Sequence, residues 1–209
     1  MKIKIYHNNL AEQNSYLLIE RNKACVIDPG FNGEAIANDL DDHGWELDTV
    51  LLTHGHYDHI RDIQYLAKTR SFLVVIHRLD KAFLSDDKLN YSQAFGAAFH
   101  LPESLLIKTL EDGERIAFGD HEIRLHHTPG HTAGSACYQM EQALFTGDTL
   151  FADSVGRTDL ATGNTRELYQ SLRYLRDHFS REIRIYPGHG NTALLKDLIN
   201  HHPFLMNGR

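Results

Sequence analysis

The first half of the chain consists of short apolar runs separated by polar and turn-forming residues. Runs of four to eight apolar or alternating residues are typical of β-strands. We expect strands at 2–7, 16–20, 24–27, 49–53 and 72–76. Residues 34–43 have helical character and end before Gly44, and a second helix is expected where Ile60, Ile63 and Leu66 recur at helical spacing. This half is therefore predicted to combine β-strands with two helices.

The second half repeats this order of elements. Short strands are expected at 105–110, 114–118, 122–127, 134–139, 143–146 and 183–186. Residues 166–179 are expected to form a helix capped by Thr165, because leucines recur on one face, and 192–199 to form the closing helix. The repeated order predicts an α/β (α+β) fold in which each half supplies a sheet and the helices lie outside, within one domain over residues 1–209.

The composition is that of an ordinary globular protein with an excess of histidine. Hydrophobic residues make up 42% of the 209 residues, and 15 residues are histidine. A net charge of −7 argues against binding to nucleic acid, whose backbone requires a basic surface. No apolar run has the length of a signal peptide or a membrane span. Cys25 and Cys137 lie in separate apolar runs and are expected to be buried thiols, so we expect a cytoplasmic protein.

A cluster of metal-binding residue types follows one of the apolar runs. The stretch 53–59, with the sequence THGHYDH, places three imidazoles and one carboxylate within six positions. Side chains alternate along an extended chain, so those of His54 and His56 project to one side, whereas Asp58 and His59 can serve a second ion if a helix begins here. Imidazole and carboxylate suit zinc and similar metals. A solvated loop would explain any one of these histidines, but not the cluster.

Four other stretches place a single aspartate or histidine directly after a predicted strand, beside glycine or proline. These residues are Asp28, His131, Asp148 and His189. Small neighbours let the backbone approach a ligand closely, and the end of a strand fixes the direction of the side chain. Together with the 53–59 stretch, the four residues supply enough ligands for two adjacent metal ions.

This set of residues resembles that of the metallo-β-lactamase superfamily. The family pattern HxHxDH, followed by single His, Asp and His residues on later loops, matches 54–59, His131, Asp148 and His189. Within the superfamily, the chain is most similar to the glyoxalase II group of thioester hydrolases. The stretches that carry this similarity are 53–59, 128–132, 145–151 and 156–159. The resemblance implies an αββα sandwich, with two mixed sheets and helices outside.

The resemblance also implies two zinc ions per chain, or iron or a mixed zinc and iron pair in their place. One ion is implied to be held by His54, His56 and His131. The other is implied to be held by Asp58, His59 and His189, and Asp148 is implied to bind both. Asp28 is implied to orient a ligand histidine, with a simple turn before Pro29 as the alternative. The implied reaction is hydrolysis of a thioester such as S-lactoylglutathione by a hydroxide that bridges the ions, with Asp58 and Asp148 as the catalytic carboxylates.

Two further parts of the chain are candidates for contact with a substrate. Arg157 can pair with a substrate carboxylate, and a solvated loop arginine is the alternative. Residues 78–102 carry charged and aromatic residues without a steady period, and form either a substrate lip or a surface excursion with buried aromatics. The expected binding partner is a small-molecule thioester, and no binding to nucleic acid or to a membrane is expected. The sequence does not predict the oligomeric state.

Four histidines are left out of the site. His126 and His127 are adjacent on one predicted strand, so only one of them can face the core. His201 and His202 follow the last predicted helix and are expected to lie in solvent. The site prediction therefore rests on the residues next to glycine, proline and strand ends.

A different substrate and a different reaction compete with the leading hypothesis. Only twenty residues follow His189, which leaves no room for the helical C-terminal domain that helps full-length glyoxalase II enzymes hold glutathione. A different thioester is therefore an alternative. Persulfide dioxygenases share the histidine motif and a Gly-Arg-Thr-Asp segment like 156–159, but use one iron held by two His and one Asp. The net negative charge disfavours a nuclease. The open position expected between the ions disfavours a purely structural metal site.

Overall fold

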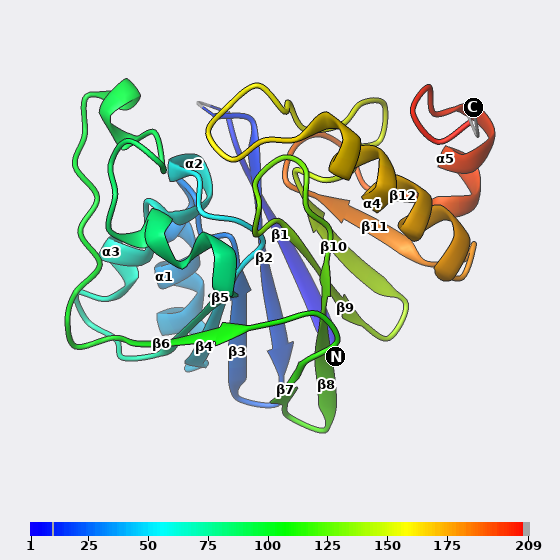
Figure 1. Ribbon diagram of the computed structural model, residues 1–209. Coiled ribbons are helices and arrows are strands. Elements are labelled where there is room, and N and C mark those ends of the chain that lie inside the picture. The colour runs from blue at the N-terminus through cyan, green and yellow to red at the C-terminus, as the bar shows by residue number, and fades with distance from the viewer. Residues whose placement is uncertain (10, 207–209) are drawn as a thin grey trace.

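Two six-stranded β-sheets form the centre of the molecule in the computed structural model, which describes residues 1–9 and 11–206. Helices α1, α2 and α3 lie outside one sheet and α4 and α5 outside the other (Figure 1). The predicted αββα sandwich of two mixed sheets is confirmed. Within the described residues, no helix is both long and apolar enough to cross a membrane.

The first sheet comes from the first half of the chain. Its strands, in spatial order, are β1 (Lys2–Asn8), β2 (Gln13–Glu20), β3 (Lys23–Ile27), β4 (Glu46–Leu52), β5 (Leu73–His77) and β6 (Leu106–Leu110). The β1–β2 and β2–β3 pairs are antiparallel, and the pairs from β3 to β6 are parallel. The parts of β3, β4 and β5 that are buried on both faces, residues 24–27, 50–52 and 74–76, are continuous apolar runs, as parallel strands usually are.

The second sheet comes from the second half. Its strands, in spatial order, are β12 (Ala193–Leu194), β11 (Arg184–Pro187), β10 (Ala143–Gly147), β9 (Ala136–Met140), β8 (His121–His127) and β7 (Arg115–Phe118). Only the β10–β11 pair is parallel. Because β8 and β10 both run antiparallel to β9, the strands β8, β10 and β11 point the same way and end at the same edge of the sheet.

Three apolar layers hold the sandwich together. The helices of the first half are α1 (Gly33–His43), α2 (Tyr57–Ile60) and α3 (Ile63–Leu66), and those of the second half are α4 (Thr165–His178) and α5 (Leu195–His201). Ile36, Leu40 and Ile63 pack on the outer face of the first sheet. Tyr16 and Phe145 meet between the sheets at a ring-centroid distance of 5.1 Å. Leucines of α4 and α5 cover the outer face of the second sheet, so each sheet buries both of its faces.

Some predicted boundaries and one predicted exposure are wrong. The helix expected over 60–66 is split into α2 and α3, and the helix at 192–199 begins only at Leu195, after the short strand β12. The cap of α4 is Asn164, whose side chain accepts the backbone N–H groups of residues 166 and 167, and Thr165 is the first helical residue. His202 is buried because the chain folds back after α5, and its Nε2 lies 3.1 Å from the carbonyl oxygen of Ser154.

Candidate metal centre

The predicted ligands gather at the edge of the sandwich where strands of both sheets end. The loop after β4 and helix α2 carry residues 54–59, the β8–β9 loop carries His131, and Asp148 and His189 follow β10 and β11. The backbone must pass very close to these side chains. A Cβ atom at Gly188 would lie 2.3 Å from Asp148 Oδ1, so this position requires glycine.

Three histidines form the first group of candidate ligands. His56 Nδ1 lies 2.8 Å from His131 Nε2, and the His54 ring centroid is 4.8 Å from that of His56 and 4.7 Å from that of His131. All three side chains are buried. Each offers one nitrogen, and the three nitrogens lie within 4.8 Å of one another. This is a trigonal face of imidazoles of the kind that binds zinc.

The second group, Asp58, His59 and His189, lies beside the first and shares a neighbour with it. His59 Nε2 is 3.8 Å from Asp58 Oδ2, which is 3.5 Å from His189 Nε2. Asp148 lies between the groups. Its Oδ1 is 3.3 Å from His59 Nε2, and its Oδ2 is 3.6 Å from both His131 Nε2 and His189 Nε2. The carboxylate of Asp148 is thus placed to contact cations in both groups.

Asp28 orients two of these histidines. Its Oδ2 accepts hydrogen bonds from His59 Nδ1 at 2.9 Å and from the Thr53 hydroxyl at 2.6 Å, and its Oδ1 accepts the Thr53 backbone N–H at 2.8 Å. Because the Thr53 hydroxyl donates to Asp28, its oxygen is left to accept from His54 Nδ1, 3.1 Å away. Both imidazoles therefore carry a proton on Nδ1 and direct Nε2 toward the site.

Backbone carbonyl groups orient two more histidines. His131 Nδ1 lies 2.7 Å from the carbonyl oxygen of Arg157, and His189 Nδ1 lies 3.0 Å from that of Glu12. A carbonyl oxygen can only accept, so each Nδ1 donates and each Nε2 is free to act as a ligand. His56 is the exception, because its Nδ1 faces the other candidate ligands.

Buried polar atoms without partners show that the centre fits metal ions. Within the described residues, the Nε2 atoms of His54 and His59 and the Oδ1 atom of Asp148 are buried and make no hydrogen bond. Unpaired buried polar atoms are costly and rare in folded proteins. The residues His54, His59 and Asp148 form one of the compact ligand groups, so cations held in the two groups, with Asp148 beside both, would satisfy all three atoms.

Burial and neighbouring charges set the protonation of the centre. Burial holds the pKa of His54 well below its usual value and lowers the pKa of His56 to about 3. Burial opposes the ionisation of Asp148, but His59 and His189 hold its pKa well below the usual range. At neutral pH the first two histidines are neutral and Asp148 is ionised, which are the states that metal ligands require. The carboxylates raise the pKa of His59 despite its burial, and a cation would take the place of that proton.

A cavity of about 410 Å³ opens above these ligands. Its lining includes the candidate ligands His56, Asp58, His131, Asp148 and His189, and the neighbouring residues Tyr91, Ala94, Phe95, Phe151, Gly156, Arg157 and Leu160. Tyr91, Ala94 and Phe95 come from the middle of the 78–102 segment, which therefore forms one wall of the cavity. Arg157 lies on the rim, where its exposed guanidinium forms a two-point ion pair with Asp159.

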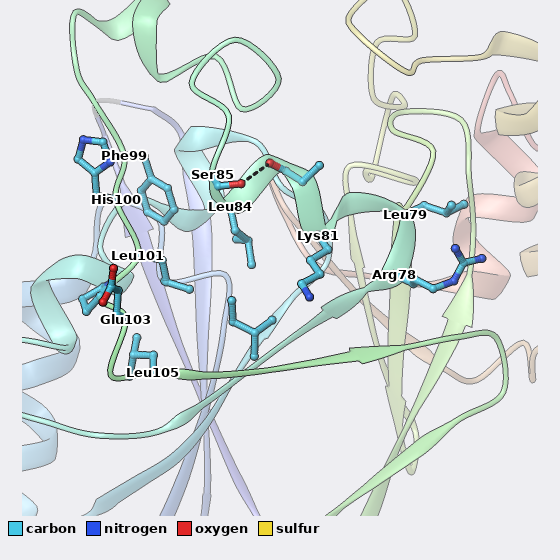
Figure 2. A pocket seen from close by; sticks show the side chains of 13 residues that line it. Arg78, Leu79, Lys81, Leu84, Ser85, Phe99, His100, Leu101, Glu103 and Leu105 are labelled. Carbon is cyan, nitrogen blue, oxygen red and sulfur yellow. Dashed lines mark hydrogen bonds between the residues drawn. The ribbon is translucent and has the colours of Figure 1, made fainter.

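A larger cavity of about 1030 Å³ holds none of the candidate ligands. It lies between the 3₁₀ helix η1 (Arg78–Leu84), residues 99–105 and strand β6, and Figure 2 shows apolar side chains such as Leu84, Phe99 and Leu105 along it. Metal-binding chemistry, rather than size, therefore identifies the smaller cavity as the candidate active site.

Three residues that support the centre have no signal in the sequence. Tyr91 adopts a left-handed backbone conformation at φ 64°, and its hydroxyl accepts the backbone N–H of Ala161, which ties two walls of the cavity together. Glu12 acts through its carbonyl group, which any residue carries. Asp80 is a lone aspartate in an irregular stretch, yet its side chain is completely buried beside the ligand loops. By contrast, His126 and His127 contact other residues and lie outside the candidate ligand groups.

The fold and the centre define a metal-dependent hydrolase, and comparison with known proteins places the chain among them. Residues 9–189 match the model of the metallo-β-lactamase superfamily, and the chain belongs to this family. The probable polyketide biosynthesis zinc-dependent hydrolase BaeB of Bacillus velezensis is 30% identical over 190 residues, which cover 90% of this chain and 77% of that protein.

Solved structures of family members superpose over nearly the whole chain. The BLEG-1 B3 metallo-β-lactamase has a TM-score of 0.89 at 29% identity, and the match covers 99% of this chain and all of that one. The protein TTHA1623 in a di-iron-bound form has a TM-score of 0.81 at 32% identity, with 92% and 95% of the two chains covered. The family binds divalent metals, and both zinc and iron occur among the names of these relatives.

Proposed function

We propose that this chain hydrolyses a small-molecule thioester at a two-metal centre. The observation that carries the proposal is the pair of ligand groups joined by Asp148, beneath a cavity open to a substrate. In this proposal His54, His56 and His131 hold the first ion, Asp58, His59 and His189 hold the second, and Asp148 contacts both. Zinc is the preferred metal, with iron or a mixed pair as alternatives.

The residues of the chain prepare the centre for hydrolysis. Asp28 and the carbonyl groups of Arg157 and Glu12 fix the orientation of the imidazoles, so that their other ring nitrogens converge on the centre. Asp58 and Asp148 supply negative charge at the centre and are the proposed catalytic carboxylates. When bound, two divalent ions would acidify water and polarise an acyl carbonyl group.

The walls of the cavity suit a thioester that carries both apolar and anionic groups. The aromatic side chains of Tyr91, Phe95 and Phe151 provide apolar surface beside the ligands. Arg157 on the rim is a guanidinium that can pair with a carboxylate of the substrate. S-lactoylglutathione combines a thioester with carboxylates and is the first compound to test.

The first experiment is metal analysis of protein purified without added metal, combined with an assay for thiol release from S-lactoylglutathione. The proposal expects close to two zinc ions, or zinc and iron, per chain, and thiol release that disappears in the Asp148→Ala variant. One iron per chain, no thioester turnover, and oxygen consumption with glutathione persulfide would instead establish the mononuclear iron persulfide dioxygenase.

The compartment and the partners are part of the same proposal. Cys25 and Cys137 are free and fully buried, and burial raises the pKa of both thiols, that of Cys137 to about 12, so neither is a reactive thiolate. Free thiols support a reducing, cytoplasmic location. The net charge of −7 supports a small-molecule substrate rather than nucleic acid. We further propose that residues 1–209 act as one domain.

A further inference from the structure

Asp80 is a buried carboxylate that the proposed chemistry does not use. It lies in η1, at the beginning of the segment that supplies one wall of the active-site cavity, and its side chain is completely buried. Its Oδ2 accepts the backbone N–H of Gly55 at 3.0 Å and the hydroxyl of Thr132 at 2.7 Å, and its Oδ1 accepts the backbone N–H of Gly134 at 2.7 Å. One carboxylate thus receives three hydrogen bonds from two loops.

Those two loops carry candidate ligands of the first metal group. Gly55 lies between His54 and His56, and Thr132 follows His131 directly. The loops approach each other where His56 Nδ1 and His131 Nε2 are 2.8 Å apart. Asp80 is therefore bonded to the backbone or side chain next to each member of this pair, without contacting either imidazole.

Close packing leaves little freedom around these bonds. A Cβ atom at Gly55 would lie 2.2 Å from Phe83 Cβ, and one at Gly134 would lie 2.5 Å from Asp80 Oδ1. Phe83 also belongs to η1, and its ring centroid is 5.7 Å from that of His56. The loops can therefore reach η1 only because both positions are glycine, and η1 holds both of them at once.

The chemistry of the contact requires a carboxylate. All three partners of Asp80 are donors, and a carboxylate accepts at both oxygens. An asparagine of the same shape would place its NH₂ group against at least one of these donors. Burial raises the pKa of Asp80, while the three hydrogen bonds and the nearby His131 act to lower it.

We propose that Asp80 is a positioning residue that sets the separation of His56 and His131 and thereby the affinity for the first metal ion. The inference rests on the proposed assignment of His54, His56 and His131 to one ion. Asp80 also fixes η1, and with it the start of the cavity wall, to the ligand loops. Contacts beyond the ligands commonly contribute about 10- to 100-fold to metal affinity.

The test compares Asp80→Asn with Asp62→Asn. Asp62 is the matched control, because it is also a buried aspartate whose carboxylate accepts a backbone N–H, that of Gly33 at 2.8 Å, and burial raises its pKa as well. Each metal-free protein is titrated with Zn²⁺ against a competing chelator, and its melting temperature is measured. The variants His56→Ala and Asp58→Ala identify which binding step belongs to which ion.

The first step is the binding of the ion assigned to His54, His56 and His131, and the second step is the binding of the other ion. The proposal expects Asp80→Asn to weaken the first step by about 10- to 100-fold and to leave the second unchanged. Asp62→Asn should lower the melting temperature without changing either step. The inference would be overturned if Asp80→Asn bound two Zn²⁺ ions with wild-type affinities. It would also be overturned if Asp80→Asn and Asp62→Asn each weakened both steps, and to the same extent. If the wild-type chain bound no Zn²⁺ at all, the proposed function itself would fail.

A second variant covers the case in which Asp80→Asn does not fold. Thr132→Val keeps the volume of the side chain and removes one of the three donors to Asp80. It should weaken the first step in the same direction by a smaller factor, again without an effect on the second. An unchanged first step in Thr132→Val would contradict the positioning role.

Discussion

Asp28 Oδ2 lies 2.9 Å from His59 Nδ1, although the two residues are 31 positions apart in the sequence. Ile27 and Leu51 pair in the parallel β3–β4 ladder, so the ends of these two strands lie together. Asp28 follows β3 directly, and residues 53–59 follow β4. The register of two strands thus decides which nitrogen of His59 faces the metal centre.

Replacement of the Asp28 carboxylate should weaken the binding of the second ion. In Asp28→Asn, the NH₂ group opposes a donor from either His59 or Thr53, and the backbone φ of 48° remains acceptable to asparagine. We expect about 10- to 100-fold weaker binding of the second ion, measured by chelator competition. The surface variant Asp120→Asn removes the same charge and should bind both ions normally. Equal affinities in Asp28→Asn and wild type would refute the orienting role.

Two alanine variants test how the ions are divided between the ligand groups. Asp148 lies between the groups, whereas the ion pairs of Asp58 within the described residues are with His59 and His189 of the second group. Asp148→Ala should reduce the content of both ions and abolish thioester hydrolysis, and Asp58→Ala should remove mainly the second ion. Metal content per chain distinguishes these outcomes. Retention of two ions by Asp58→Ala would contradict the proposed division.

Arg157 and Asp159 together test the recognition of an anionic substrate. The two side chains form an exposed two-point ion pair, so a substrate carboxylate must compete with Asp159. Arg157→Ala should raise KM about two- to fivefold for an anionic thioester, in keeping with the small energies of exposed ion pairs, and leave KM for a neutral thioester unchanged. Asp159→Asn frees the guanidinium and should lower KM for the anionic compound. An identical effect on both substrates would place Arg157 outside the recognition site.

His77 should contribute to the pH dependence of stability. It is 4% exposed and stacks on His127 at a centroid distance of 4.0 Å, and burial, followed by the charges of His127 and Arg78, lowers its pKa to about 4. An unfolded chain protonates histidine below about pH 6.5. The stability that depends on neutral His77 is therefore fully present above pH 6.5 and is lost as the pH falls from 6.5 to 4.

The variant His77→Phe keeps a stacking ring but cannot titrate. Between pH 6.5 and 4.5, the free energy of unfolding of the wild type should fall more steeply than that of the variant, by at most about 1.4 kcal/mol per pH unit. Urea unfolding at a series of pH values measures both curves. Parallel curves over this range would show that His77 does not hold a lowered pKa.

Local patterns in the sequence were sufficient for the fold and for the list of candidate ligands. Apolar runs marked the strands because a strand buried on both faces must be apolar throughout. The spacing of HxHxDH and the isolated His131, Asp148 and His189 marked strand ends rich in metal-binding groups. These features depend on residues that are close in sequence. Clusters of histidine and aspartate at strand ends are rare enough to indicate a metal site.

Tertiary structure decided how those residues are held and what surrounds them. The contact of Asp80 with Thr132 spans 52 positions, and that of Tyr91 with Ala161 spans 70, so neither has a local period. The burial of His202 likewise depends on where the chain returns after α5. The sequence by itself determined the candidate ligands and the strands that carry them. Packing between distant loops decided which ring nitrogen of each ligand histidine is protonated, which residues line the cavity, and that Asp80 accepts hydrogen bonds from both ligand loops. Hydrogen bonds between loops arise from three-dimensional proximity rather than from sequence spacing.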